Sequence, residues 1–128
     1  MISIPKNKRE ENANYRALAR DKECTLRVPG VCCYDPATTV LCHSNKLSDG
    51  KGKGYKVSDF KGVWGCYTCH TWLDQGMASA DEKDETFNTA MKRMEKELEK
   101  IVAYQMTKSK ERDAAWWALE RIRAIPAK

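Results

Sequence analysis

Apolar residues recur at steps of three and four through the C-terminal part of the chain, which predicts long amphipathic helices. A capping box at Ser79–Glu82 predicts the start of the first one, and the residues at 107–110 predict its end. Its apolar stripe contains Phe87, Met91, Met94, Leu98, Ile101 and Val102. A second helix is predicted over 111–124, with Ala114, Trp117, Ala118, Leu119 and Ile122 on one face.

The N-terminal part predicts shorter elements. A short helix is expected over 11–22, where Tyr15, Leu18 and Ala19 share one face and Arg16 and Arg20 share another, which we interpret as a solvated face. Residues rich in β-branched side chains predict strands over 25–28, over 38–41 ending at Cys42-His43, and over 60–65. Turns are predicted at Pro29-Gly30 and Asp35-Pro36, and a helix from His70.

Cysteine and histidine are confined to the segment between Cys24 and His70. It contains all six cysteines and both histidines, and the 58 residues that follow contain neither type. These are the usual ligands of zinc, so their confinement predicts a core organised by a metal ion. The strongest signal is Cys66-Tyr67-Thr68-Cys69-His70, because a C-x-x-C turn can present two thiolates to one ion.

Composition favours metal binding over disulfides. The start of the chain lacks the apolar region of a secretory signal, and no run approaches the roughly 18 apolar residues of a membrane span. We therefore expect no membrane association and a cytoplasmic location, where cysteines stay reduced. A net charge of +5 suits a polyanionic partner.

The residue spacing alone does not decide which four side chains bind zinc. Cys66 and Cys69 supply one pair, and Cys24 with Cys32 or Cys33 supplies the other. A competing interpretation makes His70 the fourth ligand in place of a cysteine. Cys42 is better explained as a small buried residue than as a ligand. A closed four-thiolate site would contribute roughly 10–16 kcal/mol of apparent binding free energy.

Lysines gather in a glycine-rich loop between the two predicted strands that precede the C-x-x-C turn. Segment 46–61 has five lysines against two aspartates, the most basic stretch of the chain. Glycine lets a backbone approach a phosphate closely, and lysine supplies point charges. We expect phosphate contacts there, against the simpler interpretation of a solvated loop, from Lys46, Lys51, Lys53 and Lys56.

The histidines stand where hydrolytic chemistry could use them. His43 ends a predicted strand and His70 starts a predicted helix, so a ββα unit built on the zinc could turn both toward one cleft. A neutral His43 could take a proton from water, and His70 could hold a catalytic divalent ion. Asp74 lies four residues after His70 and would point the same way on a helix.

This layout resembles the HNH, or His-Me finger, nuclease superfamily, in which a strand ends in the general-base histidine. Residues 22–76 resemble more closely the prophage-encoded nuclease family typified by YbcO. The matching pieces are Glu23-Cys24, Arg27, Pro29-Gly30-Val31-Cys32, residues 36–41, His43, Gly-x-Lys at 54–56, Asp59, Cys66-x-x-Cys69-His70 and Asp74.

The resemblance implies a role for each matching position. Zinc would be bound by Cys24, Cys32, Cys66 and Cys69, and Cys33 would be spare because the family has one cysteine there. His43 would be the general base and His70 a ligand of the catalytic ion. Asp59 stands near the position where the superfamily often has an asparagine that orients the base, and Asp74 or Asp59 could complete the metal shell. Cys42 stands where many members have an acidic or histidine ligand.

Together these observations predict an α+β protein. Residues 1–78 would form a nuclease domain with an N-terminal helix and a small zinc-stabilised ββα-metal core, HNH- or treble-clef-like. Residues 79–128 would form a C-terminal helical extension. The predicted function is a phage- or prophage-type endonuclease that cuts DNA with a structural Zn²⁺ and a catalytic Mg²⁺ or similar ion. The alternatives are a non-catalytic zinc module that binds nucleic acid or protein, and a helical dimerisation protein. A homodimer could form through the C-terminal helices.

Overall fold

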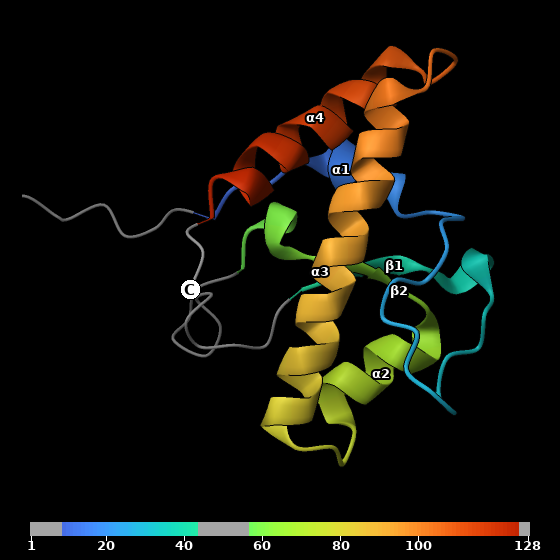
Figure 1. Cartoon of the computed structure of the whole chain (residues 1–128). Coiled ribbons are helices and arrows are strands. Elements are labelled where there is room, and N and C mark those ends of the chain that lie inside the picture. Colours follow the sequence, from blue (N-terminus) through green and yellow to red (C-terminus); the bar gives the residue numbers. More distant parts are fainter. Residues whose placement is uncertain (1–8, 44–56, 126–128) are drawn as a thin grey trace, which may run out of the picture.

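The computed structural model describes residues 9–43 and 57–125, and within these it is an α+β fold, as predicted. Four α-helices accompany one two-stranded antiparallel sheet (Figure 1). No helix among the described residues is long and apolar enough to cross a bilayer. In chain order the elements are α1 Ala13–Leu18, the 3₁₀-helix η1 Pro36–Thr38, β1 Val40–Cys42, the 3₁₀-helix η3 Asp59–Lys61, β2 Val63–Gly65, α2 Tyr67–Gln75, α3 Ala80–Ala103 and α4 Ser109–Arg123.

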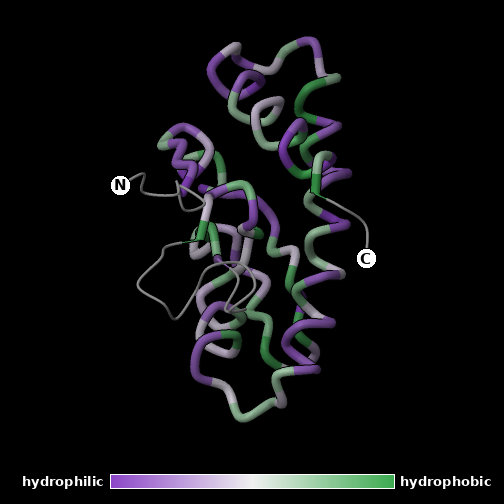
Figure 2. The backbone as a smooth tube through the Cα atoms, turned by 90° about the vertical axis from the view of Figure 1, so that its left-hand side faces the viewer, coloured by the Kyte–Doolittle hydropathy of each residue, from purple (hydrophilic) through white to green (hydrophobic). Residues whose placement is uncertain are grey.

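The two C-terminal helices begin and end close to their predicted limits. The Ser79 side chain caps α3 by accepting a hydrogen bond from the Glu82 N–H at 3.1 Å. The helix buries Phe87, Ala90, Met94 and Leu98, and apolar and polar positions alternate along it in Figure 2. The chain then leaves the helical conformation until α4 starts, which confirms the predicted break.

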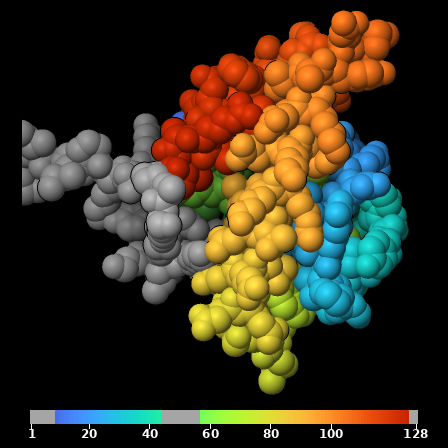
Figure 3. Space-filling model, viewed as in Figure 1, coloured from blue at the N-terminus to red at the C-terminus, as the bar shows by residue number. Residues whose placement is uncertain are grey.

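Helix α3 runs across one face of the molecule and packs on the sheet. The Trp64 N–H lies 3.4 Å from the sulfur of Met94, and the Arg93 guanidinium donates to the Thr25 carbonyl at 2.7 Å. In the space-filling view, α3 lies between α4 and the N-terminal third of the chain (Figure 3). The core is continuous from Tyr15 to Ile122, so the helices complete it. The domain boundary between residues 78 and 79 stays a prediction.

Aromatic side chains join α1, η3 and α4. The ring of Trp117 lies 5.7 Å from that of Tyr15 and 6.0 Å from that of Phe60, centroid to centroid. A six-residue helix cannot persist alone in water, so α1 depends on this packing. The cluster fixes the position of η3, which carries Asp59.

Several local predictions differ from the structure. The helix over 11–22 is confined to Ala13–Leu18, and the strand over 38–41 starts only at Val40, because η1 ends at Thr38. The prediction of a strand over 25–28 is wrong, because Arg27 adopts a left-handed φ of 46° that interrupts an extended conformation. Thr25 instead donates its N–H and its hydroxyl to the Trp64 carbonyl, both at 2.7 Å. The strand over 60–65 is confined to its second half, because η3 comes first. The helix expected from His70 begins three residues earlier, at Tyr67.

Candidate metal centre and catalytic residues

Four cysteine sulfurs converge between the N-terminal turn and the start of α2. The Sγ atoms of Cys24, Cys32, Cys66 and Cys69 all lie within 4.8 Å of one another, and those of Cys32 and Cys66 are 3.8 Å apart. Tetrahedral zinc with Zn–S bonds of about 2.3 Å separates its sulfurs by about 3.8 Å. The quartet therefore fits a zinc ion.

The backbone around the quartet is arranged for thiolates. The N–H groups of Arg27 and Val28 lie 3.4 Å from the sulfurs of Cys24 and Cys69. A hydrogen bond from the Cys69 thiol is the largest factor that lowers the pKa of Cys24 to about 4, and the same bond raises the pKa of Cys69. Sulfur must be deprotonated to bind metal, so these N–H groups favour the ligating form.

The remaining cysteines lie outside the quartet. Cys33 is exposed and its sulfur lies 3.6 Å from the Thr38 hydroxyl. Cys42 is fully buried in β1, and burial raises the pKa of its thiol. Its sulfur lies against the carbonyls of Val40 and Gly65 at 3.7 and 3.9 Å, which fits the interpretation of a small buried residue.

His43 follows β1 and pairs with a buried carboxylate. Its Nε2 atom lies 3.0 Å from Oδ1 of Asp59, whose side chain is 0% exposed, while the His43 side chain is 28% exposed. Because an ionised carboxylate can only accept, the proton on the imidazole sits on Nε2. That tautomer leaves Nδ1 as an acceptor.

Asp59 is held by the N-terminal segment. Its Oδ2 accepts the Asn12 N–H at 2.7 Å and an Arg16 guanidinium N–H at 2.6 Å, and Arg9 lies 3.7 Å from Oδ1. Burial alone would raise the pKa of Asp59. The hydrogen bonds from Asn12, His43 and Arg16 outweigh it, so the pKa lies below its usual 3.8. The carboxylate is thus charged at neutral pH.

His70 and Asp74 lie on one face of α2, as their spacing predicts. His70 Nε2 and Asp74 Oδ2 are 3.2 Å apart, and both side chains are about 40% exposed. Two ligands at right angles on an ion with bonds of about 2.1 Å would be about 3.0 Å apart. The pair therefore fits two positions on a small divalent ion. His70 lies outside the sulfur quartet, which already supplies four ligands.

Some predicted positions are not brought together. In the described part of the chain, the sulfur quartet is the only group of three or more potential ligands, so neither Asp59 nor a third side chain joins His70 and Asp74. The four lysines proposed to contact phosphate, Lys46, Lys51, Lys53 and Lys56, lie outside the described residues.

Sequence reasoning missed the support for Asp59. We interpreted Arg16 as part of a solvated face. Its side chain is 40% exposed, and the structure adds an ion pair with the fully buried Asp59 that the sequence did not indicate. Asn12 and Arg9 are further partners. These contacts span more than forty residues of sequence, and no local pattern signals them. The sequence offered one hint of these contacts: Arg16 directly follows Tyr15, a buried residue of α1.

Comparison with known proteins identifies relatives of this chain. The model of the family described as "Putative nuclease YbcO" matches residues 13–116. Two similar proteins are "Putative nuclease YbcO" of Escherichia coli strain K12 and "Putative nuclease ybcO" of Enterobacteria phage 82. Each is 40% identical over 63 residues, which cover 49% of this chain. The chain spans 65% of the length of these curated relatives.

A similar solved structure is described as "Structure of a putative bacteriophage protein from Escherichia coli str. K-12 substr. MG1655". It is 31% identical, with a TM-score of 0.49, and the match covers 61% of this chain and 85% of that one.

Proposed function

Because the chain belongs to the family described as "Putative nuclease YbcO", we propose that it is a metal-dependent endonuclease that hydrolyses DNA phosphodiester bonds. The observation that carries the proposal is the hydrogen bond from His43 Nε2 to the buried Asp59 carboxylate at 3.0 Å. A histidine oriented by a carboxylate is one arrangement that supports general-base catalysis.

In the proposed reaction, Nδ1 of His43 accepts a proton from a water molecule. The water oxygen attacks the phosphorus, and the bond from phosphorus to the leaving oxygen breaks. The Asp59 carboxylate stabilises the imidazolium that forms and fixes the ring so that Nδ1 faces outward. Asn12, Arg16 and Arg9 keep that carboxylate charged. The leaving oxygen takes a proton from solvent water, and the His43 imidazolium then returns its proton to solvent.

His70 and Asp74 are the residues proposed to hold the catalytic ion. When bound, a divalent ion there would polarise a phosphate oxygen and stabilise negative charge on the leaving oxygen. A magnesium ion commonly uses one or two protein ligands and completes its shell with substrate phosphates and water. His70 and Asp74, whose ligand atoms are 3.2 Å apart, could supply these two protein ligands.

Cys24, Cys32, Cys66 and Cys69 are proposed to bind structural zinc. The sheet consists of two three-residue strands, and such a small sheet is marginal by itself. A zinc contribution of roughly 10–16 kcal/mol equals or exceeds the whole stability of an ordinary domain, about 5–15 kcal/mol. Zinc would join the start of α2, which carries His70, to the N-terminal turn.

Substrate contacts would come first from the glycine-rich loop. Lys46, Lys51, Lys53 and Lys56 are proposed to contact backbone phosphates, on the sequence alone. Phosphate contacts position a nuclease without selecting a sequence. The homodimer through the C-terminal helices remains a prediction; Trp116 on α4 is 48% exposed.

The decisive experiment measures nicking of supercoiled plasmid with Mg²⁺, Mn²⁺ or no added divalent ion. His43→Gln is the matched variant, because its amide can still donate to Asp59 but cannot accept a proton. We expect metal-dependent nicking to fall by roughly 10²–10⁴-fold in His43→Gln, with unchanged zinc content and unfolding midpoint. Wild-type nicking rates in His43→Gln would refute the mechanism.

A second candidate, a zinc module that binds nucleic acid without cutting it, is favoured by one observation. The position before His43 is Cys42, fully buried and outside the sulfur quartet, so it supplies no ligand where many HNH nucleases have one. This candidate predicts that zinc-loaded protein binds DNA, that no metal ion supports nicking, and that His43→Gln binds DNA as tightly as wild type.

A further inference from the structure

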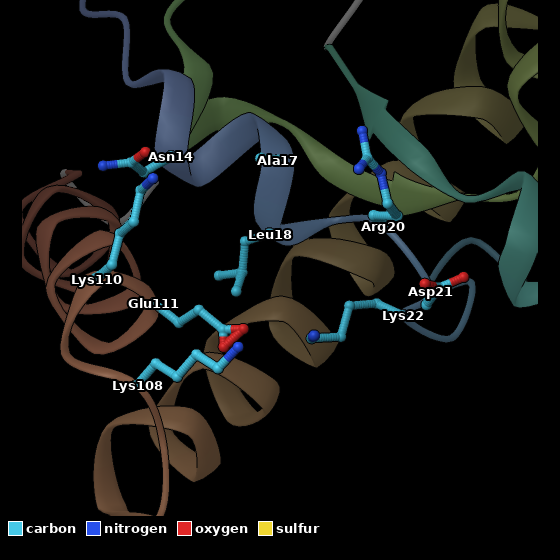
Figure 4. A pocket seen from close by; sticks show the side chains of 9 residues that line it. All are labelled: Asn14, Ala17, Leu18, Arg20, Asp21, Lys22, Lys108, Lys110 and Glu111. Atoms are coloured by element: carbon cyan, nitrogen blue, oxygen red, sulfur yellow. The ribbon is translucent and has the colours of Figure 1, made fainter.

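A cavity of about 370 Å³ lies between the end of α1 and the start of α4 (Figure 4). One wall comes from α1 and the turn that follows it, and the other from the beginning of α4. The lining residues are Asn14, Ala17, Leu18, Arg20, Asp21, Lys22, Lys108, Lys110 and Glu111.

Cationic residues outnumber acidic residues in the lining of the cavity. The lining contains two acidic residues, Asp21 and Glu111, against four cations, which are Arg20, Lys22, Lys108 and Lys110. Figure 4 shows Lys22 and Lys108 extending into the space near Leu18 from opposite sides. Among the described residues, none of these four cations forms an ion pair or a side-chain hydrogen bond. Their charge is therefore available to a ligand.

The cavity is separate from the proposed catalytic residues. Asn12 and Arg16 lie four positions apart on the side of α1 that holds Asp59. Helical spacing turns Asn14, Ala17 and Leu18 toward the opposite side of α1. A ligand in the cavity would thus contact the far side of α1 from His43.

We propose that this basic cavity is a second DNA-binding site, which holds the sugar-phosphate backbone of the substrate outside the point of cleavage. This inference rests on the proposed nuclease function. Four cations against two acids suit a polyanion. Asn14 adds amide donors. The lining has no aromatic side chain for base stacking, so binding would be independent of sequence.

The test is DNA affinity as a function of salt. Fluorescence anisotropy with a labelled duplex, zinc-loaded protein and no added catalytic ion measures binding without cleavage. Each lost phosphate contact lowers the slope of log Kd against log salt by about 0.9. We expect Lys108→Ala/Lys110→Ala to lower the slope by about 1.8 and to raise the Kd at least about 5-fold near 0.1 M salt. Lys22→Ala tests the opposite wall and should lower the slope by about 0.9.

The matched control is Lys92→Ala/Lys96→Ala, which removes the same charge from exposed positions on α3. It should leave the slope within about 0.5 of wild type. Pocket variants that bind like this control would overturn the proposal, as would wild-type protein that does not bind duplex DNA. A slope lowered only in the pocket variants, with no nicking of plasmid by wild type under any metal, would support the second site while rejecting the nuclease function.

Discussion

The hydrogen bond between His43 and Asp59 makes Asp59→Asn the most informative substitution. The two carboxylate oxygens accept from different sides: Oδ2 from Asn12 and Arg16, and Oδ1 from His43. An asparagine has one oxygen and one NH₂ group, so it can accept on one side only. Two donors, one of them charged, hold Oδ2, so the amide oxygen should take that place and turn its NH₂ group toward His43.

That exchange would reverse the imidazole tautomer. His43 Nε2 would become the acceptor for the amide, and the proton would move to Nδ1, the atom that must take a proton from water. We expect Asp59→Asn to lower the rate of DNA nicking by roughly 10²–10⁴-fold, the usual contribution of a general base. The unfolding free energy should fall by only about 1 kcal/mol, since the Oδ2 contacts persist.

Asp59→Ala separates folding from chemistry. Breaking a fully buried ion pair typically costs about 3–5 kcal/mol, but the side chains of Arg16 and Arg9 are 40% and 24% exposed and can turn to solvent. We therefore expect a loss of about 2–3 kcal/mol, the range of hydrogen bonds to charged groups. Urea denaturation and plasmid nicking are measured on the same zinc-loaded samples. A folded Asp59→Asn protein that nicks at the wild-type rate would refute the assigned tautomer and role.

The remaining predictions concern the metal ligands and the ion pair. Cys32→Ser should lose zinc and unfold, whereas Cys33→Ser should keep one zinc per chain by atomic absorption; equal zinc content in both variants would reject the quartet. His70→Ala and Asp74→Ala should each raise the Mg²⁺ concentration needed for half-maximal nicking while leaving folding intact, and unchanged metal dependence would remove both from the site. Arg16→Ala should cost about 1 kcal/mol. The folded-state pKa of Asp59 is lowered, so the loss of unfolding free energy in Arg16→Ala should stay constant from pH 8 to 5. It should shrink only below about pH 4, near the unfolded-state pKa. A loss that disappears by pH 5 would show that Asp59 is protonated there.

Local spacing predicted most of what the chain builds within one or two turns. Ser79 caps α3, and His70 and Asp74 share a face of α2. The pairing of Cys66 with Cys69 follows from C-x-x-C geometry. The choice of Cys32 over Cys33 came from resemblance to a family, and the structure places the Cys32 sulfur in the quartet and leaves Cys33 exposed.

What could not be predicted depends on contacts distant in sequence. β-branched residues favour a strand at 25–28, but the backbone there turns so that N–H groups of Arg27 and Val28 face cysteine sulfurs. Tertiary demands of this kind override strand propensity. Likewise, no local pattern predicts that the surface residue Arg16 pairs with Asp59, which lies 43 positions later in the chain.

The C-terminal helices acquire a role in the site that sequence patterning did not assign. Trp117 of α4 packs on Tyr15 of α1 and on Phe60 of η3. Phe60 is adjacent to Asp59, and Tyr15 is adjacent to Arg16, so one indole ring positions both members of the ion pair. Since Asp59 in turn orients His43, the geometry of the proposed base depends on packing with a helix more than forty residues away. Helix α4 therefore supports the side of the molecule that carries the proposed base, much as zinc is proposed to hold the other end of the sheet.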